Sequence, residues 1–246
     1  MNPTTKYSFS DLFKDVLDLS GKSRDSSGDD LTEAKRIVNH AYRKFLIAHD
    51  WSFLKMQGVL VTTSGDYDYD LPDDFAELID GFYYSPDDSH KKVIETGIGT
   101  ILNLRSMSES TGRPYLFAIR PSGYDATDGT KWEVLFKYTP NGEYELLYMY
   151  RIGVDVLVND DDIPVGGFDH APTVRNFCLS EVEKFFEDGK VQIHTKELYD
   201  ILLPQSIEKD KNKRPRSLGF LRSGERVPYD SNRVGDIYFG DVNTSE

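Results

Sequence analysis

The sequence predicts an α+β protein: an antiparallel helical bundle with an inserted small antiparallel β-domain and an extended C-terminal arm. Two segments near the N-terminus and two between 171 and 209 repeat apolar residues at the spacing of a helix with one buried face. Between them, short extended runs alternate with turn signals. After Lys211 no periodicity is sustained. The predicted parts are the N-terminal helices of the bundle (1–52), the β-domain (53–158), the C-terminal helices (159–211) and the arm (212–246).

Two helices are predicted before the β-domain. Ser8 suits an N-cap with Asp11 three residues later, close to a capping box, and Gly21 ends this helix. Its apolar side consists of Phe9, Leu12, Phe13, Val16, Leu17 and Leu19. The second helix starts at Asp29, because carboxylates are favoured at the positive helix end, and is expected to stop at Asp50-Trp51. Its buried stripe consists of Leu31, Ala34, Ile37, Val38, Ala41, Tyr42, Phe45 and Leu46.

The middle of the chain reads as strands around one helix. Extended segments are predicted at 59–62, 67–71, 80–84, 92–94, 115–120, 132–138 and 144–150, and a helix at 97–108. The residue before Pro72 is pushed out of the helical region, and 72–75 forms a turn. Pro140-Asn141-Gly142 is a strong hairpin signal between two of the strands. A turn is predicted at 85–90.

Two more helices are predicted after the β-domain. The first runs from Ala171 to Asp188, with Pro172 tolerated in its first turn. Its stripe consists of Val174, Phe177, Cys178, Val182, Phe185 and Phe186. The second runs from Val191 to about Lys209, and Pro204 is expected to kink it.

Composition limits the function classes. A chain of 246 residues can bury a real core, and its 15 Tyr and 14 Phe suit β-surfaces and subunit interfaces. No apolar run approaches a membrane span and no signal peptide is recognisable, so a cytoplasmic location is expected. Cys178 is the single cysteine, which excludes an internal disulfide or a cysteine-based zinc site. A net charge of −13 argues against general nucleic-acid binding.

Metal and catalytic motifs were weighed and rejected. Asp66, Asp68, Asp70 and Glu77 match four ligand positions of an EF-hand loop, but Leu71 stands where the loop needs glycine. We interpret these carboxylates as a solvated strand edge. His40 and His49 lack clustered ligand partners, and Asp160–Asp162 reads as a loop. No phosphate-binding glycine loop, GxSxG elbow or HExxH motif occurs. The prediction is a non-enzymatic protein without metal or cofactor.

The stretch from His49 to Ile79 carries a family pattern: a tryptophan-aromatic block, a T-T-x-G turn, an aromatic residue, and an L-P-x-D-F segment. The residues that match are Trp51, Phe53, Thr62, Thr63, Gly65, Tyr69, Leu71, Pro72, Asp74 and Phe75. This pattern resembles the head-to-tail adaptors (connector, or tail tubular protein A-like) of short-tailed bacteriophages. Long helices on both sides of a β-rich insert extend the likeness up to Lys211.

The resemblance implies a structural virion protein of the phage neck, assembled in the host cytoplasm. About twelve copies would form a ring below the portal protein and extend the DNA channel. The ring would help to retain packaged DNA, which passes through the lumen without specific binding, and would provide the attachment platform for the tail, nozzle or next ring protein. No membrane is involved. Trp51, Phe53, Tyr69, Leu71, Pro72 and Phe75 are expected to fix the junction between bundle and β-domain.

The C-terminal arm is the predicted portal-docking element. Its first part is basic, and the later part is too apolar for a simple linker, although a disordered tail is the alternative. A basic arm on an acidic body suits docking to an acidic neighbour. The candidate anchors are Arg214, Arg216, Phe220, Tyr238 and Phe239.

Two alternatives remain open at this point. One is a tail-completion or stopper ring protein further from the portal. The other is a binding module whose β-domain recognises a carbohydrate or host factor through exposed tyrosines such as Tyr83, Tyr84 and Tyr148.

Overall fold

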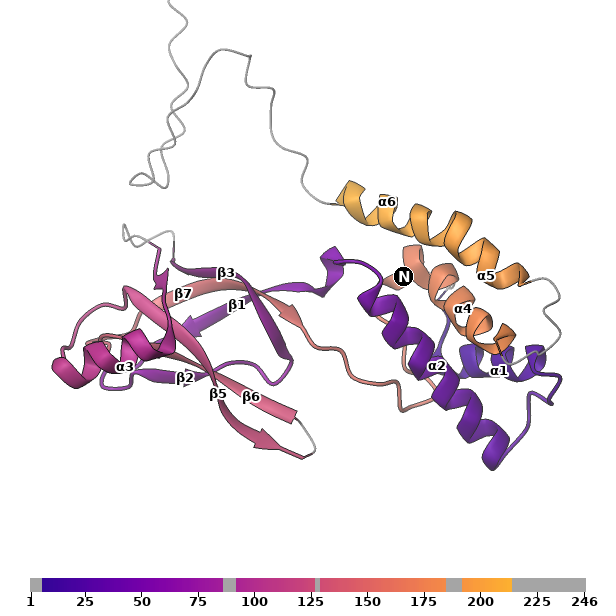
Figure 1. The fold of residues 1–246 in the computed structure, drawn as a ribbon, viewed down its shortest axis with the longest axis horizontal. Coiled ribbons are helices and arrows are strands. Elements are labelled where there is room, and N and C mark those ends of the chain that lie inside the picture. Colours follow the sequence, from indigo (N-terminus) through magenta and orange to yellow (C-terminus); the bar gives the residue numbers. More distant parts are fainter. Residues whose placement is uncertain (1–5, 86–91, 127–128, 185–191, 214–246) are drawn as a thin grey trace, which may run out of the picture. The chain divides into compact units, whose positions relative to one another are not determined.

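A computed structural model describes residues 6–85, 92–126, 129–184 and 192–213 (Figure 1). These residues form two compact units, each with more contacts inside it than outside. The first contains the chain up to Met56 and again from Ile152, and all its main elements are helices. The second, Gln57–Arg151, contains two small sheets and one helix. The fold class is therefore mixed α+β, as the sequence predicts.

Helices α1 (Phe9–Leu19) and α2 (Asp29–Ile47) begin where predicted. Ser8 and Asp11 form the capping box, and five of the six predicted apolar residues of α1 are buried, whereas Leu19 is half-buried. Helix α2 ends before the expected Asp50-Trp51, so His49 lies outside it. The reason is a tertiary contact: the Trp51 indole donates a 2.8 Å hydrogen bond to the carbonyl of Phe45 in the last helical turn.

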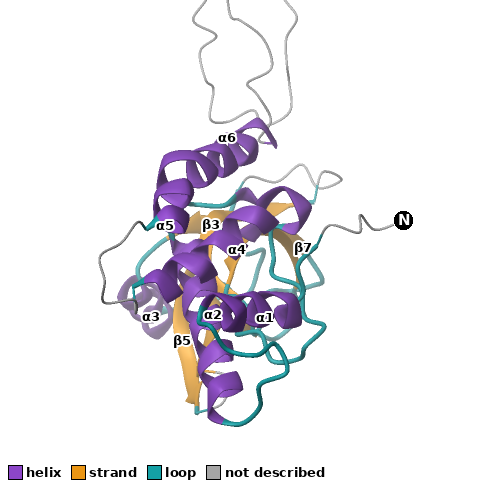
Figure 2. Cartoon of the chain, turned by 90° about the vertical axis from the view of Figure 1, so that its right-hand side faces the viewer, coloured by secondary structure: helices purple, strands orange, loops and turns teal. Residues whose placement is uncertain are grey.

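Helix α4 (Gly167–Glu183) is the centre of the helical unit and packs against α1, α2, α5 and α6 (Figure 2). It starts before the predicted Ala171, so the expectation that Pro172 lies in the first turn is wrong. Gly166 takes a left-handed conformation (φ +105°) that starts the helix early. Polar residues of α4 are also buried, among them His170, Asn176 and Glu181, because neighbouring helices cover several of its faces.

The last predicted helix is divided into α5 (Ile193–Glu197), a π-helical turn (Leu198–Leu202) and α6 (Leu203–Lys213). The Leu203 amide donates to the carbonyl of Leu198, five residues back. Proline cannot donate a helical hydrogen bond and its ring collides with the carbonyl four residues earlier. The wider π turn directly before Pro204 relieves that collision, so the helix continues through the proline.

The second unit consists of two sheets. Strands β1 (Lys55–Val61), β7 (Glu145–Ile152) and β3 (Phe75–Tyr84) form a three-stranded sheet in that order. Strands β2 (Asp68–Asp70), β6 (Gly129–Phe136), β5 (Leu116–Asp125) and β4 (Ile94–Glu95) form a four-stranded one. Helix α3 (Ile98–Met107) connects β4 to β5 and packs on β5 and β6.

The prediction of a purely antiparallel β-domain is wrong at one strand pair. Strand β4 pairs with β5 in parallel, with Ile94 opposite Leu116. Parallel neighbours need a crossover connection, and α3 supplies it. Strand β6 pairs with β2 on one side and with β5 on the other, and both of these pairs are antiparallel.

The hairpin predicted at Pro140-Asn141-Gly142 is also wrong, because β6 and β7 belong to different sheets. A two-residue hairpin turn needs a left-handed conformation at its glycine, and Gly142 is not among the glycines with positive φ. Instead, the segment is bonded by a distant loop: Gly65 donates to the carbonyl of Pro140, and the Thr62 hydroxyl donates to that of Gly142, both at 3.0 Å.

The two sheets share an aromatic core. Phe82 lies 4.9 Å from Phe117 and 4.8 Å from Tyr148, measured between ring centroids. Phe136 lies 6.1 Å from Phe82. Two of these rings belong to the three-stranded sheet and two to the four-stranded sheet, so the core holds the sheets face to face.

Candidate functional site

The family-pattern residues lie in two separate groups, one in each unit. In the helical unit, Trp51 is completely buried. Its ring lies 4.7 Å from Phe45, 5.5 Å from Phe53 and 5.0 Å from His170, measured between centroids. Gly166 sits against this stack: a Cβ there would lie 3.2 Å from both Phe53 and His170. The aromatic block therefore joins the end of α2 to the start of α4.

Between the two stacked aromatics, Ser52 makes a polar contact with α6. Its amide donates to both carboxylate oxygens of Asp210 at 3.1 Å, and its hydroxyl donates to Oδ1 at 2.5 Å. His49 Nε2 lies 3.5 Å from the same carboxylate. One helical turn earlier on α6, the Ser206 hydroxyl lies 2.5 Å from His170 Nδ1. Asp210, Ser206 and His170 are buried. We call this group, His49, Ser52, His170, Ser206 and Asp210, the α6 dock.

Neither Ser52 nor Asp210 stands in a recognisable motif, and none of the α6 dock was predicted as a site. The two residues are 158 positions apart. The available signal was Asp210, an acidic residue on the same side of the helix as the apolar Leu203 and Ile207. A carboxylate on a buried side requires a hydrogen-bond donor, which predicts a polar partner nearby. A serine, a histidine and an aspartate do meet here, packed inside the helical unit.

In the β-rich unit, the T-T-x-G turn carries the chain from the three-stranded sheet to the four-stranded one. Thr62 is completely buried. Its amide donates to the carbonyl of Tyr144 at 3.0 Å, and its hydroxyl accepts from the Tyr144 amide at 2.9 Å. The Tyr69 hydroxyl lies 2.8–3.0 Å from backbone atoms of Thr63 and Asp66 and closes the loop. Gly65 provides the left-handed residue that this turn requires (φ +101°).

The L-P-x-D-F segment carries the chain back to the three-stranded sheet. Leu71 and Phe75 are buried, and the amide of Phe75 donates to the carbonyl of Pro72 at 2.9 Å. Phe75 stacks on Tyr150 at 5.8 Å, and the Tyr150 hydroxyl donates to Asp74. In this unit the pattern residues therefore form the two connections, before and after β2, by which the chain passes between the sheets. That all the pattern residues fix the junction of the units stays a prediction.

Burial and ion pairs set the electrostatics of the helical unit. The Tyr42 hydroxyl accepts from the Val165 amide at 2.9 Å, and burial raises the pKa of Tyr42 to about 12. Burial alone would raise the pKa of Glu181, but its ion pairs with Lys184 and Lys44 lower that pKa below the ordinary value. Burial raises the pKa of the Cys178 thiol far above its usual range, so this thiol is inert.

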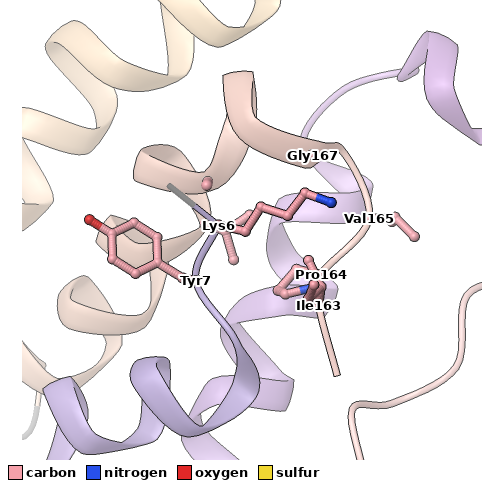
Figure 3. A pocket seen from close by; sticks show the side chains of 8 residues that line it. Lys6, Tyr7, Ile163, Pro164, Val165 and Gly167 are labelled. Atoms are coloured by element: carbon pink, nitrogen blue, oxygen red, sulfur yellow. The ribbon is translucent and has the colours of Figure 1, made fainter. Parts of the chain in front are cut away.

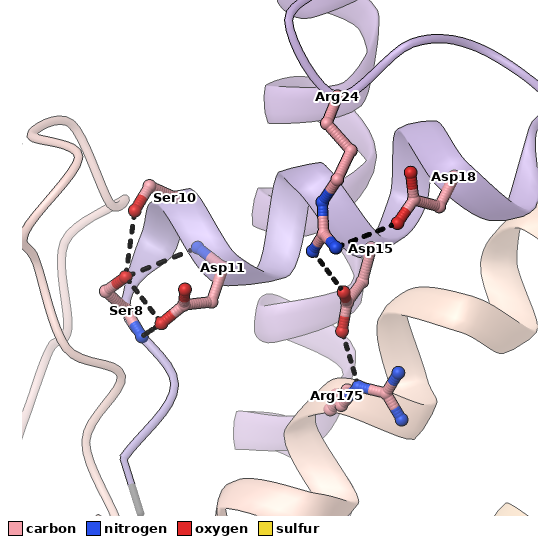
Figure 4. A network of polar contacts seen from close by, with 7 residues as sticks. All are labelled: Ser8, Ser10, Asp11, Asp15, Asp18, Arg24 and Arg175. Carbon is pink, nitrogen blue, oxygen red and sulfur yellow. Dashed lines mark hydrogen bonds and ion pairs between the residues drawn. The ribbon is translucent and has the colours of Figure 1, made fainter. Parts of the chain in front are cut away.

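The cavities of the helical unit do not suggest a small-molecule site. The void beside Tyr7, Pro164 and Val165 measures about 10 Å³, room for no more than about one water molecule (Figure 3). An open groove of about 310 Å³ is lined by Asp15, Asp18 and Arg175, among others. Its carboxylates are already paired: Arg24 contacts Asp15 and Asp18, and Arg175 donates to Asp15 (Figure 4).

The metal and membrane predictions concern clusters of ligand side chains and long apolar helices in residues 6–85, 92–126, 129–184 and 192–213. There, no group of His, Cys, Asp or Glu is arranged to hold a metal ion. Asp68 and Asp70 lie on β2, which is an edge strand, in agreement with the interpretation of a solvated edge. Among the helices placed by the structure, none is long and apolar enough to cross a membrane.

Several predicted residues lie outside the described residues. They include the arm anchors Arg214, Arg216, Phe220, Tyr238 and Phe239, the helix residues Phe185 and Phe186, and the turn at 86–90. In contrast, the tyrosines that motivated a carbohydrate-binding module are described, and two of them are not exposed. Tyr84 and Tyr148 are buried, with exposed fractions of 8% and 3%. The exposure behind that alternative is therefore wrong for Tyr84 and Tyr148, whereas Tyr83 is half-buried.

The family model described as "SU10 adaptor protein" matches residues 7–216. No curated protein matches the chain. The match covers both units and the two pattern groups within them.

Proposed function

Because the chain belongs to the SU10 adaptor protein family, a family of short-tailed phage head-to-tail adaptors, we propose that its copies form a ring directly below the portal. The ring extends the DNA channel, helps to retain the packaged genome and provides the platform to which the tail attaches. About twelve copies surround the channel, by analogy with the family. Assembly, rather than chemistry, is the mechanism.

The observation that supports a portal-docking arm most directly is the α6 dock. Helix α6 leads into residues 214–246, and Ser52 holds that helix by part-buried hydrogen bonds to Asp210, one turn before its end. An arm with a fixed root loses less conformational entropy on binding than one that leaves from a mobile helix. We propose that the arm docks on the portal, with Arg214, Arg216, Phe220, Tyr238 and Phe239 as contacts.

The two units take different roles in this proposal. The helical unit is a bundle into which the β-rich unit is inserted, and bundles of neighbouring copies pack around the ring. The β-rich unit meets the tail, nozzle or next ring protein. A chain with a net charge of −13 lacks the excess of cations that DNA binding requires, so DNA passes the lumen without specific contacts.

The mass of the purified protein, alone and mixed with the portal protein of the same phage, tests this function. We expect one copy alone and a large closed complex on mixing. A chain lacking residues 214–246, which keeps α6 intact, should fold and no longer join the portal. A chain lacking only residues 1–5 serves as the control and should still bind the portal.

Two results would contradict the adaptor role, and a third would contradict only the docking role of the arm. If the full chain does not bind the portal at all, the adaptor role is wrong. If it binds only a portal that already carries another ring, the protein is a tail-completion or stopper ring further along the neck. If the truncated chain assembles normally, the adaptor role stands and only the docking role of the arm fails.

A further inference from the structure

Strand β1 has one free edge. It pairs with β7, and no other strand of the described residues pairs with it. The Thr62 amide, directly after β1, donates to Tyr144 directly before β7, so this residue faces the partner strand. Backbone groups of successive residues in a strand point in opposite directions. The N–H and C=O groups of Gln57, Val59 and Val61 therefore point away from β7.

The side chains along this edge are apolar and exposed. Gly58 faces the sheet interior, because a Cβ there would lie 2.3 Å from the ring of Tyr148. Alternate residues take the opposite face, where Val59 and Val61 are 53% and 55% exposed. Val59 and Val61 thus present both free backbone groups and apolar side chains.

The edge also lacks the protection that edge strands usually carry. Natural edges are blocked by charged residues or proline. The one charged residue of β1 is Lys55 at its first position, which pairs with Asp50 before the strand. From Met56 to Gly65 the chain has neither a charged residue nor a proline, although 29% of all its residues are charged. The other edge strands placed by the structure do carry carboxylates: Asp68 and Asp70 on β2, Glu77 and Asp80 on β3, and Glu95 on β4. An unprotected edge of this kind accepts an added strand.

Charge identifies the partner. Two copies of a chain with net charge −13 repel each other, so a contact between copies is favoured at an edge that carries no carboxylates. A basic partner would gain more at the acidic edges. We propose that the free edge of β1, residues 57–61, is the contact with a second copy of this chain, which adds an extended segment there. This contact rests on the proposed ring, whose neighbours meet through unlike surfaces.

A lysine on the exposed edge tests the contact. Val59→Lys and Val61→Lys place a charge on the proposed interface without disturbing buried atoms. Ile94→Lys is the matched control, because Ile94 is 59% exposed on another edge strand of the same unit. With the portal present, chemical cross-linking of the wild type and of Ile94→Lys should give a ladder of linked copies. We expect the ladder of both valine variants to be reduced at least tenfold, while each still binds the portal and melts at the wild-type temperature.

Amide hydrogen exchange on the full chain provides a second measurement. The amides of Gln57, Val59 and Val61 should become slow to exchange when copies assemble on the portal. A full ladder from Val59→Lys, or unchanged exchange in an assembled ring, would overturn the contact and leave the ring itself intact. Protection that appears only after tail protein is added would assign the edge to the tail and overturn the proposal. A wild type that forms no complex with the portal would refute the ring and this contact together.

Discussion

The amide and hydroxyl of Ser52 both donate to the buried carboxylate of Asp210, which lies 158 residues further along the chain. Ser52 stands between Trp51 and Phe53, whose rings stack 5.5 Å apart in the core. The aromatic block is thus a two-sided element. Its rings hold α2 and α4 together, and the serine between them holds α6.

Ser52→Ala should destabilise the helical unit. It removes the hydroxyl donor to Asp210 and leaves that carboxylate with one hydrogen bond fewer, which costs about 1–3 kcal/mol. Ser27→Ala is the control, because Ser27 is exposed. The two units carry one tryptophan each, Trp51 and Trp132. Fluorescence-detected urea unfolding in a Trp132→Phe background therefore reports the helical unit. Equal unfolding midpoints for the two serine variants would refute the role of this contact.

Thr62→Val should destabilise the β-rich unit. Valine preserves the shape but removes the hydroxyl that donates to Gly142 and accepts from Tyr144, so two part-buried backbone groups lose this partner. The expected loss is about 1–3 kcal/mol. Thr63→Val changes the neighbouring exposed threonine and should stay within about 0.5 kcal/mol of the wild type. Urea unfolding followed by Trp132 fluorescence measures both, and a similar effect of the two variants would contradict the prediction.

Gly58→Ala should also destabilise the β-rich unit, for a steric reason. The added methyl would lie 2.3–2.6 Å from the Tyr148 ring, and overpacking of this kind costs about 1–3 kcal/mol. Gly99→Ala provides a control of opposite sign, because Gly99 lies in α3 with no atom within 4 Å of an added Cβ. It should stabilise the chain by about 0.5–1 kcal/mol. Thermal unfolding compares the two; a Gly58→Ala variant as stable as the wild type would show that Tyr148 can move aside.

Two buried tyrosines should ionise late in an alkaline titration. Burial raises the pKa of Tyr42 and of Tyr148 to about 12, from an ordinary value of 10.0. Folding therefore holds both phenols neutral. Their contribution to stability is fully present below the unfolded pKa and is lost as pH rises from 10 towards 12.

The near-ultraviolet absorbance of tyrosinate measures this titration. The last rise in absorbance should coincide with unfolding of each unit, and Tyr42→Phe and Tyr148→Phe should each remove part of it. A control, Tyr124→Phe, changes a tyrosine that is 78% exposed and should remove only absorbance that appears earlier. If all tyrosines of the folded chain ionise near pH 10.0, the ordinary pKa of tyrosine, the expected effect of burial on Tyr42 and Tyr148 is wrong.

Much of the helical unit follows from local sequence. The capping box at Ser8 and the apolar stripes of α1 and α2 were predictable, because N-caps and helical periodicity depend on residues three or four positions apart. Most strands of the β-rich unit were predictable as well, because short extended runs between turn residues are also a local signal. The end of α2 was misjudged because a tertiary bond, from the Trp51 indole to Phe45, turns the chain.

What the sequence alone determined is therefore the element types, their order and the family to which the pattern belongs. Only the tertiary structure decided the partners. Asn141-Gly142 favours a hairpin locally. In the structure, however, the Thr62 hydroxyl donates to the Gly142 carbonyl and the Gly65 amide donates to the Pro140 carbonyl, and β7 pairs in a different sheet from β6. Only the folded structure shows that Ser52 supplies the hydrogen bonds that the buried Asp210 requires. It also shows that β1 pairs with β7 along one edge and leaves its other edge without a described partner. Pairing across such separations depends on burial and on hydrogen bonds between distant residues, and no local preference encodes it.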